Sequence, residues 1–201
     1  MKYFIAVTLL ALLSSCEISI NKDHVAEGNR LMAEGDYPNA ALEFDDALFM
    51  DEDNLHALRG KYLCALNLGY RDEALEAVNK FIRLQPVSSV GYHDRGTIFM
   101  MDEDYEKALN DFDKVIELGT DYPAIAYFNK GEVLKSLKRD RDAIACYQYV
   151  VGVDKNDARA FLKLAQCYSN LTMQDSACAA FRKAKDLGDE EANKEFNAYC
   201  K

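Results

Sequence analysis

The sequence contains few of the residues that interrupt helices. Among its 201 residues there are only three prolines and ten glycines, the two residue types that most destabilise helix interiors. No low-complexity or Ser/Pro-rich linker divides the chain, so nothing in it indicates a second domain. The content of 49% hydrophobic and 29% charged residues is typical of a folded domain, and excludes a disordered chain or an integral membrane protein.

Basic residues are scarce relative to acidic ones. The chain has 24 Lys and Arg against 34 Asp and Glu, which gives a net charge of −10 at pH 7. Proteins bind nucleic acids mainly by neutralising phosphates with Lys and Arg, so we expect no nucleic-acid partner. The same imbalance argues against docking on anionic lipid through a basic patch.

Motifs for catalysis and for bound ions are also missing. There is no glycine-rich phosphate loop, no Gly-x-Ser-x-Gly turn and no paired Cys/His nucleophile motif. His24, His56 and His93 have no carboxylate or cysteine at metal-ligand spacing in the sequence. The acidic runs 51–54 and 102–104 do not continue into a calcium-binding loop. The sequence therefore predicts no enzyme activity, no cofactor and no metal site.

What the sequence does contain is a repeat. Alanine recurs at intervals of 34 or 35 residues, with a bulky apolar residue four places later and another apolar residue three places after that. Steps of four and three keep one face of an α-helix apolar. The alanines are Ala40, Ala74, Ala108, Ala143 and Ala177, and the residues four places later are Phe44, Val78, Phe112, Tyr147 and Phe181.

A second periodic segment precedes each of these helices, so each unit is predicted to form two short helices joined by a tight turn. The expected ends of the second helices are marked by Pro86, Gly119, Gly152 and Gly188. In the first helix, one shared position is occupied by His24, Leu58, Tyr92, Tyr127 and Phe161, and four units have a small residue four places later, namely Gly28, Gly96, Gly131 and Ala165.

The small residue at the eighth position, the alanine at the twentieth and the aromatic residue at the twenty-fourth resemble the tetratricopeptide repeat (TPR). The resemblance implies an all-α fold, a right-handed α-solenoid of about five helix-turn-helix repeats, with a capping helix over 190–201. The second unit departs from the pattern, because Gly60 lies two places early and Tyr62 takes the small-residue position. The repeat domain is predicted over 21–191, with units at about 21–54, 55–88, 89–123, 124–157 and 158–191.

The resemblance also implies a concave groove lined by the first helix of each repeat. Positions two, five and nine of the repeat face this groove in the family, and their mixed polar and apolar character suits an extended peptide or a partner helix. The carboxylate clamp of some repeat proteins is not reproduced, because Val25 stands where its first lysine would be. The residues carried over are Asn29, Arg59, His93, Thr97, Phe128, Glu132, Arg159, Leu162 and Gln166.

The first residues have the layout of a secretory signal peptide, with Lys2 followed by an apolar run over 3–13. The run is too short to span a bilayer, which takes roughly 20 residues. The segment Leu13-Ser14-Ser15-Cys16 resembles the lipobox of bacterial lipoproteins. That resemblance implies a signal peptide over 1–15, acylation of Cys16 with chains such as palmitate, and a lipidated tether over 16–20. An ordinary secretion signal cut nearby is the alternative.

These features predict a lipid-anchored protein of the bacterial cell envelope. Glu17 follows Cys16, and no aspartate stands there to resemble an inner-membrane retention signal, which favours the outer membrane.

Five cysteines remain beyond Cys16. If adjacent helices form antiparallel hairpins, Cys146 lies nearly opposite Cys167, and Cys178 lies nearly opposite Cys200. We therefore consider two disulfides, 146–167 and 178–200, with Cys64 as a buried thiol. The alternative is that all five are small core residues.

Two functions fit these observations. The first is an interaction scaffold that binds envelope proteins through its groove and contacts the membrane through its lipid. The alternative is a module that binds a non-protein ligand, such as a carbohydrate or peptidoglycan fragment, with Tyr92, Tyr127 and Phe161 as stacking platforms. The register of these rings favours burial between helices.

Overall fold

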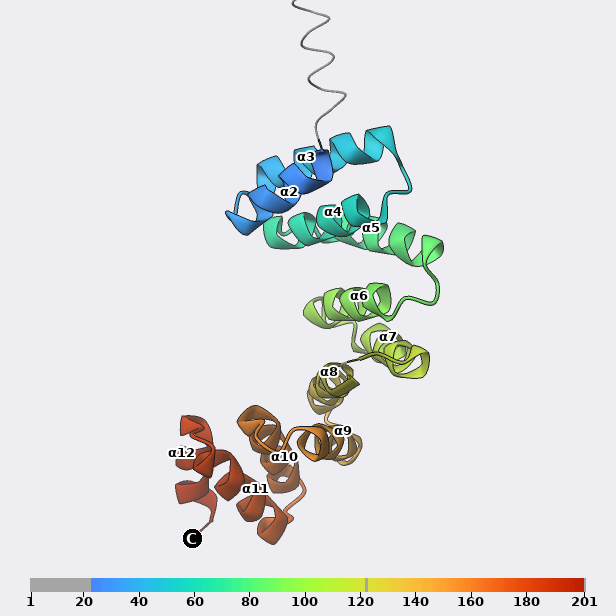
Figure 1. Ribbon diagram of the computed structural model, residues 1–201. Helices are drawn as coiled ribbons and strands as arrows, with labels where there is room; N and C mark the ends of the chain where they lie inside the picture. The colour runs from blue at the N-terminus through green and yellow to red at the C-terminus, as the bar shows by residue number, and fades with distance from the viewer. Residues whose placement is uncertain (1–22, 122, 201) are drawn as a thin grey trace, which may run out of the picture. The chain divides into compact units, whose positions relative to one another are not determined.

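The computed structural model describes residues 23–121 and 123–200, and in these ranges it contains eleven α-helices and no β-strand (Figure 1). The predicted signal peptide, Cys16 and the predicted tether lie outside the described residues. None of the described helices is both long enough and apolar enough to cross a membrane. The helices are α2 (His24–Ala33), α3 (Tyr37–Met50), α4 (Leu55–Leu68), α5 (Arg71–Leu84), α6 (Ser89–Met101), α7 (Tyr105–Leu118), α8 (Pro123–Ser136), α9 (Asp140–Val153), α10 (Ala158–Asn170), α11 (Gln174–Asp186) and α12 (Glu190–Tyr199).

The helices divide between two compact units. Helices α2 to α5 belong to a unit that ends at Leu84, and α6 to α12 belong to a unit that begins at Gln85. Within each unit every helix packs against the next one along the chain, and α2 also contacts α4, as α6 contacts α8. The first helices α2 and α4, and likewise α6 and α8, are therefore neighbours, as an all-α TPR solenoid requires.

Helix ends follow from local chemistry. The side chains of Asp23, Asn54, Asp157 and Asp189 each accept a hydrogen bond from the backbone N–H three residues later, at 2.8 to 3.0 Å. This bond satisfies one of the N–H groups that a helix start leaves without a partner. Capping of this kind is not general, because α6, α7, α9 and α11 begin without a side-chain cap hydrogen bond.

The predicted stops of the second helices are only partly correct. Gly119 caps α7 with a positive φ of 77°, and Gly188 follows α11 with a φ of 94°. Gly152 instead lies inside the last turn of α9, which continues to Val153. Asp154 ends that helix in an extended conformation, so no left-handed residue is needed at this turn.

The predicted repeat register describes the core. All five register alanines are fully buried, as are Phe44, Phe112 and Tyr147. These aromatic rings lie against the small residues of the preceding helix, and a Cβ atom at Gly131 would be 2.9 Å from the Tyr147 ring. The small residue thus makes room for the ring.

In the second repeat, the large residue and the smaller residue exchange positions. Tyr62 occupies its small-residue position and is fully buried, while Val78 stands where the other repeats have an aromatic ring. Tyr62 packs edge-on against Phe81, with ring centroids 6.4 Å apart. Gly60 faces the preceding repeat, where a Cβ atom would overlap the Phe44 ring. The irregular spacing is therefore a compensated packing arrangement, and α4 keeps its full length of 14 residues.

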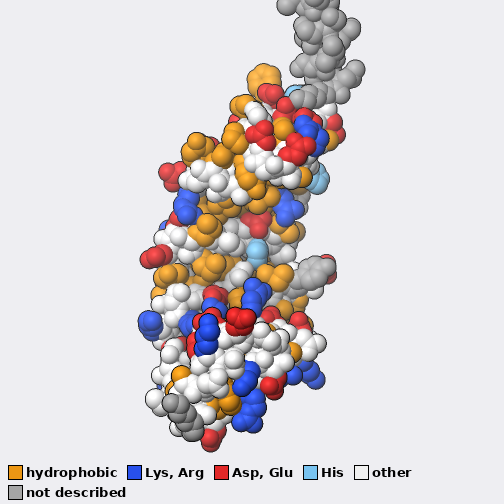
Figure 2. All heavy atoms as spheres, turned by 90° about the vertical axis from the view of Figure 1, so that its left-hand side faces the viewer, with side chains coloured by type: hydrophobic (Ala, Val, Ile, Leu, Met, Phe, Trp, Pro, Cys, Tyr) orange, Lys and Arg blue, Asp and Glu red, His pale blue; other side chains and the backbone are white. Residues whose placement is uncertain are grey.

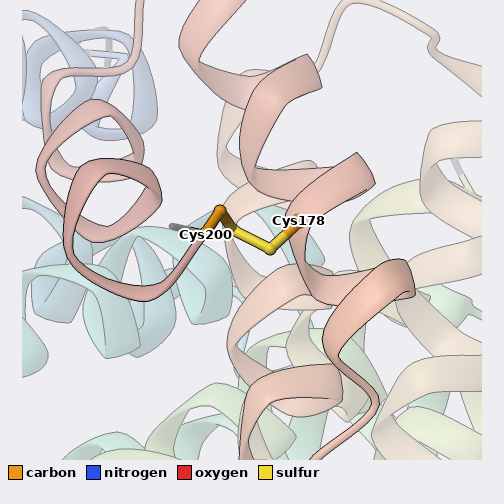
Figure 3. The surroundings of a disulfide bond; sticks show 2 residues. All are labelled: Cys178 and Cys200. Carbon is orange, nitrogen blue, oxygen red and sulfur yellow. A yellow bond between two sulfur atoms is a disulfide. The ribbon is translucent and has the colours of Figure 1, made fainter.

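The C-terminal helix α12 covers the last repeat. A disulfide joins Cys178 of α11 to Cys200 at the end of α12, with Cα atoms 5.5 Å apart (Figure 3). The Tyr199 ring packs against Phe181 at 6.3 Å. The Phe196 ring lies beneath the cations of Arg182 and Lys185.

The second disulfide that we considered is not formed. Cys146 and Cys167 are both free and buried, as is Cys64. Burial raises the pKa of both thiols; the charges that act on Cys146 belong to Lys130, Asp113 and Asp142, whereas Asp140 is the first residue that raises the pKa of Cys167. The two thiols thus lie in different electrostatic surroundings, although their helices pack together. The hairpin argument places α9 beside α10 but does not fix the direction of these side chains.

Candidate functional site

The residues predicted to line a groove divide between the two units. Asn29 on α2 and Arg59 on α4 are exposed in the first unit. The other seven lie on α6, α8 and α10 of the second unit, where contacts link these three helices into one surface. We call this surface the first-helix face, and it is made of His93, Thr97, Phe128, Asn129, Glu132, Arg159, Lys163 and Gln166.

One predicted groove residue is not part of this face. Leu162 is only 4% exposed and belongs to the hydrophobic core of the second unit. Position five of the repeat faces the groove in the family, but in α10 this position packs inward. Leu162 is therefore a core residue, and its assignment to the groove was wrong.

His93 connects α6 to α8. Its Nε2 lies 3.1 Å from the Asn129 side-chain nitrogen, and its Nδ1 lies 3.2 Å from an Asp94 oxygen. The Thr97 hydroxyl donates to the His93 carbonyl oxygen at 3.0 Å. The Thr97 hydroxyl therefore bonds within α6, whereas the His93 ring contacts residues of both α6 and α8.

Phe128 and Arg159 lie beside a hollow in the face, with Phe128 partly buried and Arg159 exposed. The Arg159 guanidinium lies over the Phe128 ring, 5.3 Å from its centroid, and the ring packs edge-on against Tyr147 at 5.7 Å. Beside them is a hollow of about 200 Å³. Its wall includes Ile125, which is 53% exposed, and the buried Val150. Ala124, Asn129 and Asp157 also line the hollow, which thus combines an apolar wall with an amide and with charged groups of both signs.

Glu132 is held from two sides. One of its oxygens accepts from the Tyr147 hydroxyl, and the other lies 2.8 Å from Lys163 Nζ of α10. Burial, and then the hydrogen bond to Glu132, raise the pKa of Tyr147 far above its usual value. This hydroxyl therefore stays a donor at every physiological pH, and Glu132 acts as a fixed tie between α8, α9 and α10.

Gln166 likewise connects three helices, which are α8, α10 and α12. Its oxygen accepts from Lys135 of α8, and its nitrogen donates to Glu195 of α12 at 2.9 Å. Sequence reasoning missed Asn129, Lys163, Lys135 and Glu195. Each is paired with a residue about one repeat away, so a search for complementary polar residues at that spacing would have found them.

Charge on the molecule is mixed. On the face drawn in Figure 2, acidic and basic side chains lie close to one another, without separation into patches of one sign. That side of the molecule therefore presents no broad attractive field of one sign.

Comparison with known families decides what this arrangement is. Three profiles, each described as a tetratricopeptide repeat, match residues 25–89, 124–157 and 159–187. The chain is a tetratricopeptide-repeat protein.

Curated TPR relatives are much longer than this chain. The DnaJ homolog subfamily C member 3 homolog of Dictyostelium discoideum is 27% identical over 161 residues, which are 73% of this chain and 31% of that protein. The human DnaJ homolog subfamily C member 7 is 28% identical over 146 residues, 69% of this chain and 28% of that protein. The chain thus spans less than a third of the length of these relatives.

Solved TPR structures of similar size share the fold. The protein YrrB, whose structure is described as having an unusual peptide-binding site, is 21% identical with a TM-score of 0.76, over 92% of this chain and 97% of that one. MamA is 24% identical with a TM-score of 0.75, over 85% and 92%. The pilus biogenesis factor PilW is 21% identical with a TM-score of 0.71, over 87% and 89%.

The three rings considered as sugar-stacking platforms all make contacts inside the second compact unit. Tyr127 stacks on Tyr149 with centroids 3.9 Å apart. Tyr92 donates to the Pro86 carbonyl oxygen and lies beneath Arg95. Phe161 packs against the core. These contacts favour a packing role and give no support to the carbohydrate-binding alternative.

Proposed function

We propose that this TPR protein is a binding scaffold that holds a protein partner on the first-helix face, and that a lipid on Cys16 anchors it to a bacterial membrane. The observation that carries the binding proposal is the hollow beside Phe128 and Arg159. Apolar hollows with a few placed polar groups are the usual form of a binding site.

The chemistry of the hollow suggests what the partner presents. Ile125 and Phe128 offer an apolar surface, and Arg159, which shares the hollow with Asp157, offers a guanidinium that can bind a carboxylate. The partner is therefore a peptide segment, extended or helical, with a bulky apolar side chain close to an acidic group. Arg and aromatic residues are also the types that dominate binding energy at protein interfaces.

The surrounding ties favour binding by holding the surface in one arrangement. The pairs His93–Asn129 and Glu132–Lys163 connect successive first helices before any partner arrives. Less side-chain freedom is then lost on binding, which favours affinity.

The test is affinity capture from cross-linked envelopes with Phe128→Ala/Arg159→Ala. Phe49→Ala/Arg141→Ala is the matched control, because it removes the same two residue types at exposed positions on the second helices α3 and α9. We expect one or a few specific partners with the wild type and the control, and their loss with the first-helix variant. Equal capture by both variants would contradict binding through this face.

The anchor is tested separately, because Cys16 lies outside the described residues. We expect a clickable palmitate analogue to label the wild type in bacterial cells and not Cys16→Ser, which should leave the membrane fraction. A palmitate-free wild type released into the soluble fraction would instead fit an ordinary secretion signal.

A further inference from the structure

A cluster of potential metal ligands lies between α2 and α3. His24 Nδ1 is 2.8 Å from an oxygen of Glu43 and 3.8 Å from an oxygen of Asp46. One ligand atom from each of the three side chains lies within 4.8 Å of the other two. Glu43 and Asp46 are three residues apart on α3, so both carboxylates point from one face of that helix towards α2.

The histidine is unusual for its place in the repeat. The same position is occupied by Leu58, Tyr92, Tyr127 and Phe161 in the other four units. His24 is 8% exposed, as buried as a packing residue, yet its Nδ1 faces two carboxylates. Apolar packing is what this position contributes elsewhere, so packing alone does not explain the imidazole.

The separations suit a zinc-like ion. Zinc bound at 2.0–2.2 Å in tetrahedral geometry separates neighbouring ligand atoms by about 3.4 Å. The observed separations of 2.8 and 3.8 Å lie on either side of that value. An imidazole nitrogen favours zinc and similar transition metals over calcium or magnesium. Two carboxylates and a neutral imidazole also balance the charge of a divalent cation.

We propose that His24, Glu43 and Asp46 bind one divalent transition-metal ion and thereby clamp α2 onto α3. The sequence predicted no metal site, because the ligands lie on separate helices with no recognisable spacing. The proposed clamp would hold the first described helix as the Cys178–Cys200 disulfide holds the last. It is independent of what the first-helix face binds.

The test is calorimetric titration of untagged protein with zinc, accompanied by thermal melts. His24→Leu is the informative variant, because the second repeat has Leu58 at this position and folds around it. We expect one zinc per chain and a higher melting temperature for the wild type, with affinity lowered roughly tenfold or more in His24→Leu and in Glu43→Gln. Calcium and magnesium should produce no comparable shift.

Cobalt substitution identifies the ligands directly. Cobalt bound at the proposed site has no thiolate ligand, so its spectrum should lack a sulfur-to-cobalt charge-transfer band. His56→Ala and His93→Ala should bind as the wild type does. Equal zinc affinity in His24→Leu, a thiolate band, or no zinc binding by the wild type would each overturn the proposal.

Discussion

At the scale of single residues, the fold depends on where the sequence places a small residue opposite a ring. Gly28 and Gly60 both face the Phe44 ring, which is fully buried and has little room to move. Gly152 has nothing within 4 Å of where its Cβ atom would be. Substitution by alanine should therefore destabilise the protein at Gly60 and stabilise it at Gly152.

We expect Gly60→Ala to lower the free energy of unfolding by about 1–3 kcal/mol, because the added methyl overlaps the ring. Gly152→Ala lies in a helix with open surroundings and should raise it by about 0.5–1 kcal/mol, because alanine is the better helix former. Urea denaturation measures both. Two losses of equal size would show that the packing around Phe44 is not as described.

The free thiols make a second residue-scale prediction. Burial raises the pKa of Cys64 to about 11, and raises that of Cys167 to about 12 with a contribution from Asp140. The folded protein thus keeps protons that the unfolded chain loses above about pH 9. The stabilisation is complete below pH 9 and is lost as pH rises towards 11 and 12.

Urea denaturation at pH 7.5 and at pH 10 should therefore show lower stability at the higher pH, with a smaller difference in Cys64→Ala. A thiol reagent at pH 8 should label Cys64, Cys146 and Cys167 only after denaturant is added. Rapid labelling of the native protein would contradict their burial.

Single residues also show where sequence reasoning reached its limit. The register alanines and their aromatic partners followed from spacing alone, because they repeat every 34 or 35 residues. The inward packing of Leu162 and the different surroundings of Cys146 and Cys167 did not, because they depend on the rotation of a helix about its axis. The spacing of residues in the sequence predicts the position of each residue along a helix, but not how that helix is rotated about its axis.

At the scale of elements, the terminal helix α12 shows how the end of the array is closed. It packs on α11 through Tyr199 and Phe196, and its Glu195 accepts from Gln166 of α10. The two bonded cysteines are 22 residues apart in the sequence. The chain-entropy account gives such a loop a stabilisation of about 3 kcal/mol.

Reduction with a phosphine should therefore lower the urea midpoint of the wild type and expose α12 to proteolysis. The variant Cys178→Ser/Cys200→Ser should match the reduced wild type and should not respond to the reductant. A wild-type midpoint that is unchanged by reduction would show that the disulfide does not hold this helix.

The elements were also the part of the fold that the sequence predicted best. Each of the five predicted units holds two helices, with α8 beginning one residue before the expected boundary. The polar ties between these helices were not predicted, because each joins polar residues 29 to 36 positions apart. Apolar periodicity predicts helices, whereas these ties appear only when complementary polar residues are sought about one repeat apart.

At the scale of the whole molecule, one face of α6, α8 and α10 is where we propose that a protein partner binds. Phe128 and Arg159 are central to it, because they flank a hollow and leave a ring and a guanidinium within reach of a partner. We therefore expect a contact that depends on few residues.

Site-specific photo-cross-linking tests this claim most directly. A benzoylphenylalanine placed at position 128 should yield a discrete cross-linked protein in cells that produce this chain naturally, and the same group at the exposed position 49 should not. The cross-link at 128 should also disappear when Arg159→Ala is added. A product of equal intensity at both positions, or one from position 49 alone, would contradict a partner bound on the first-helix face.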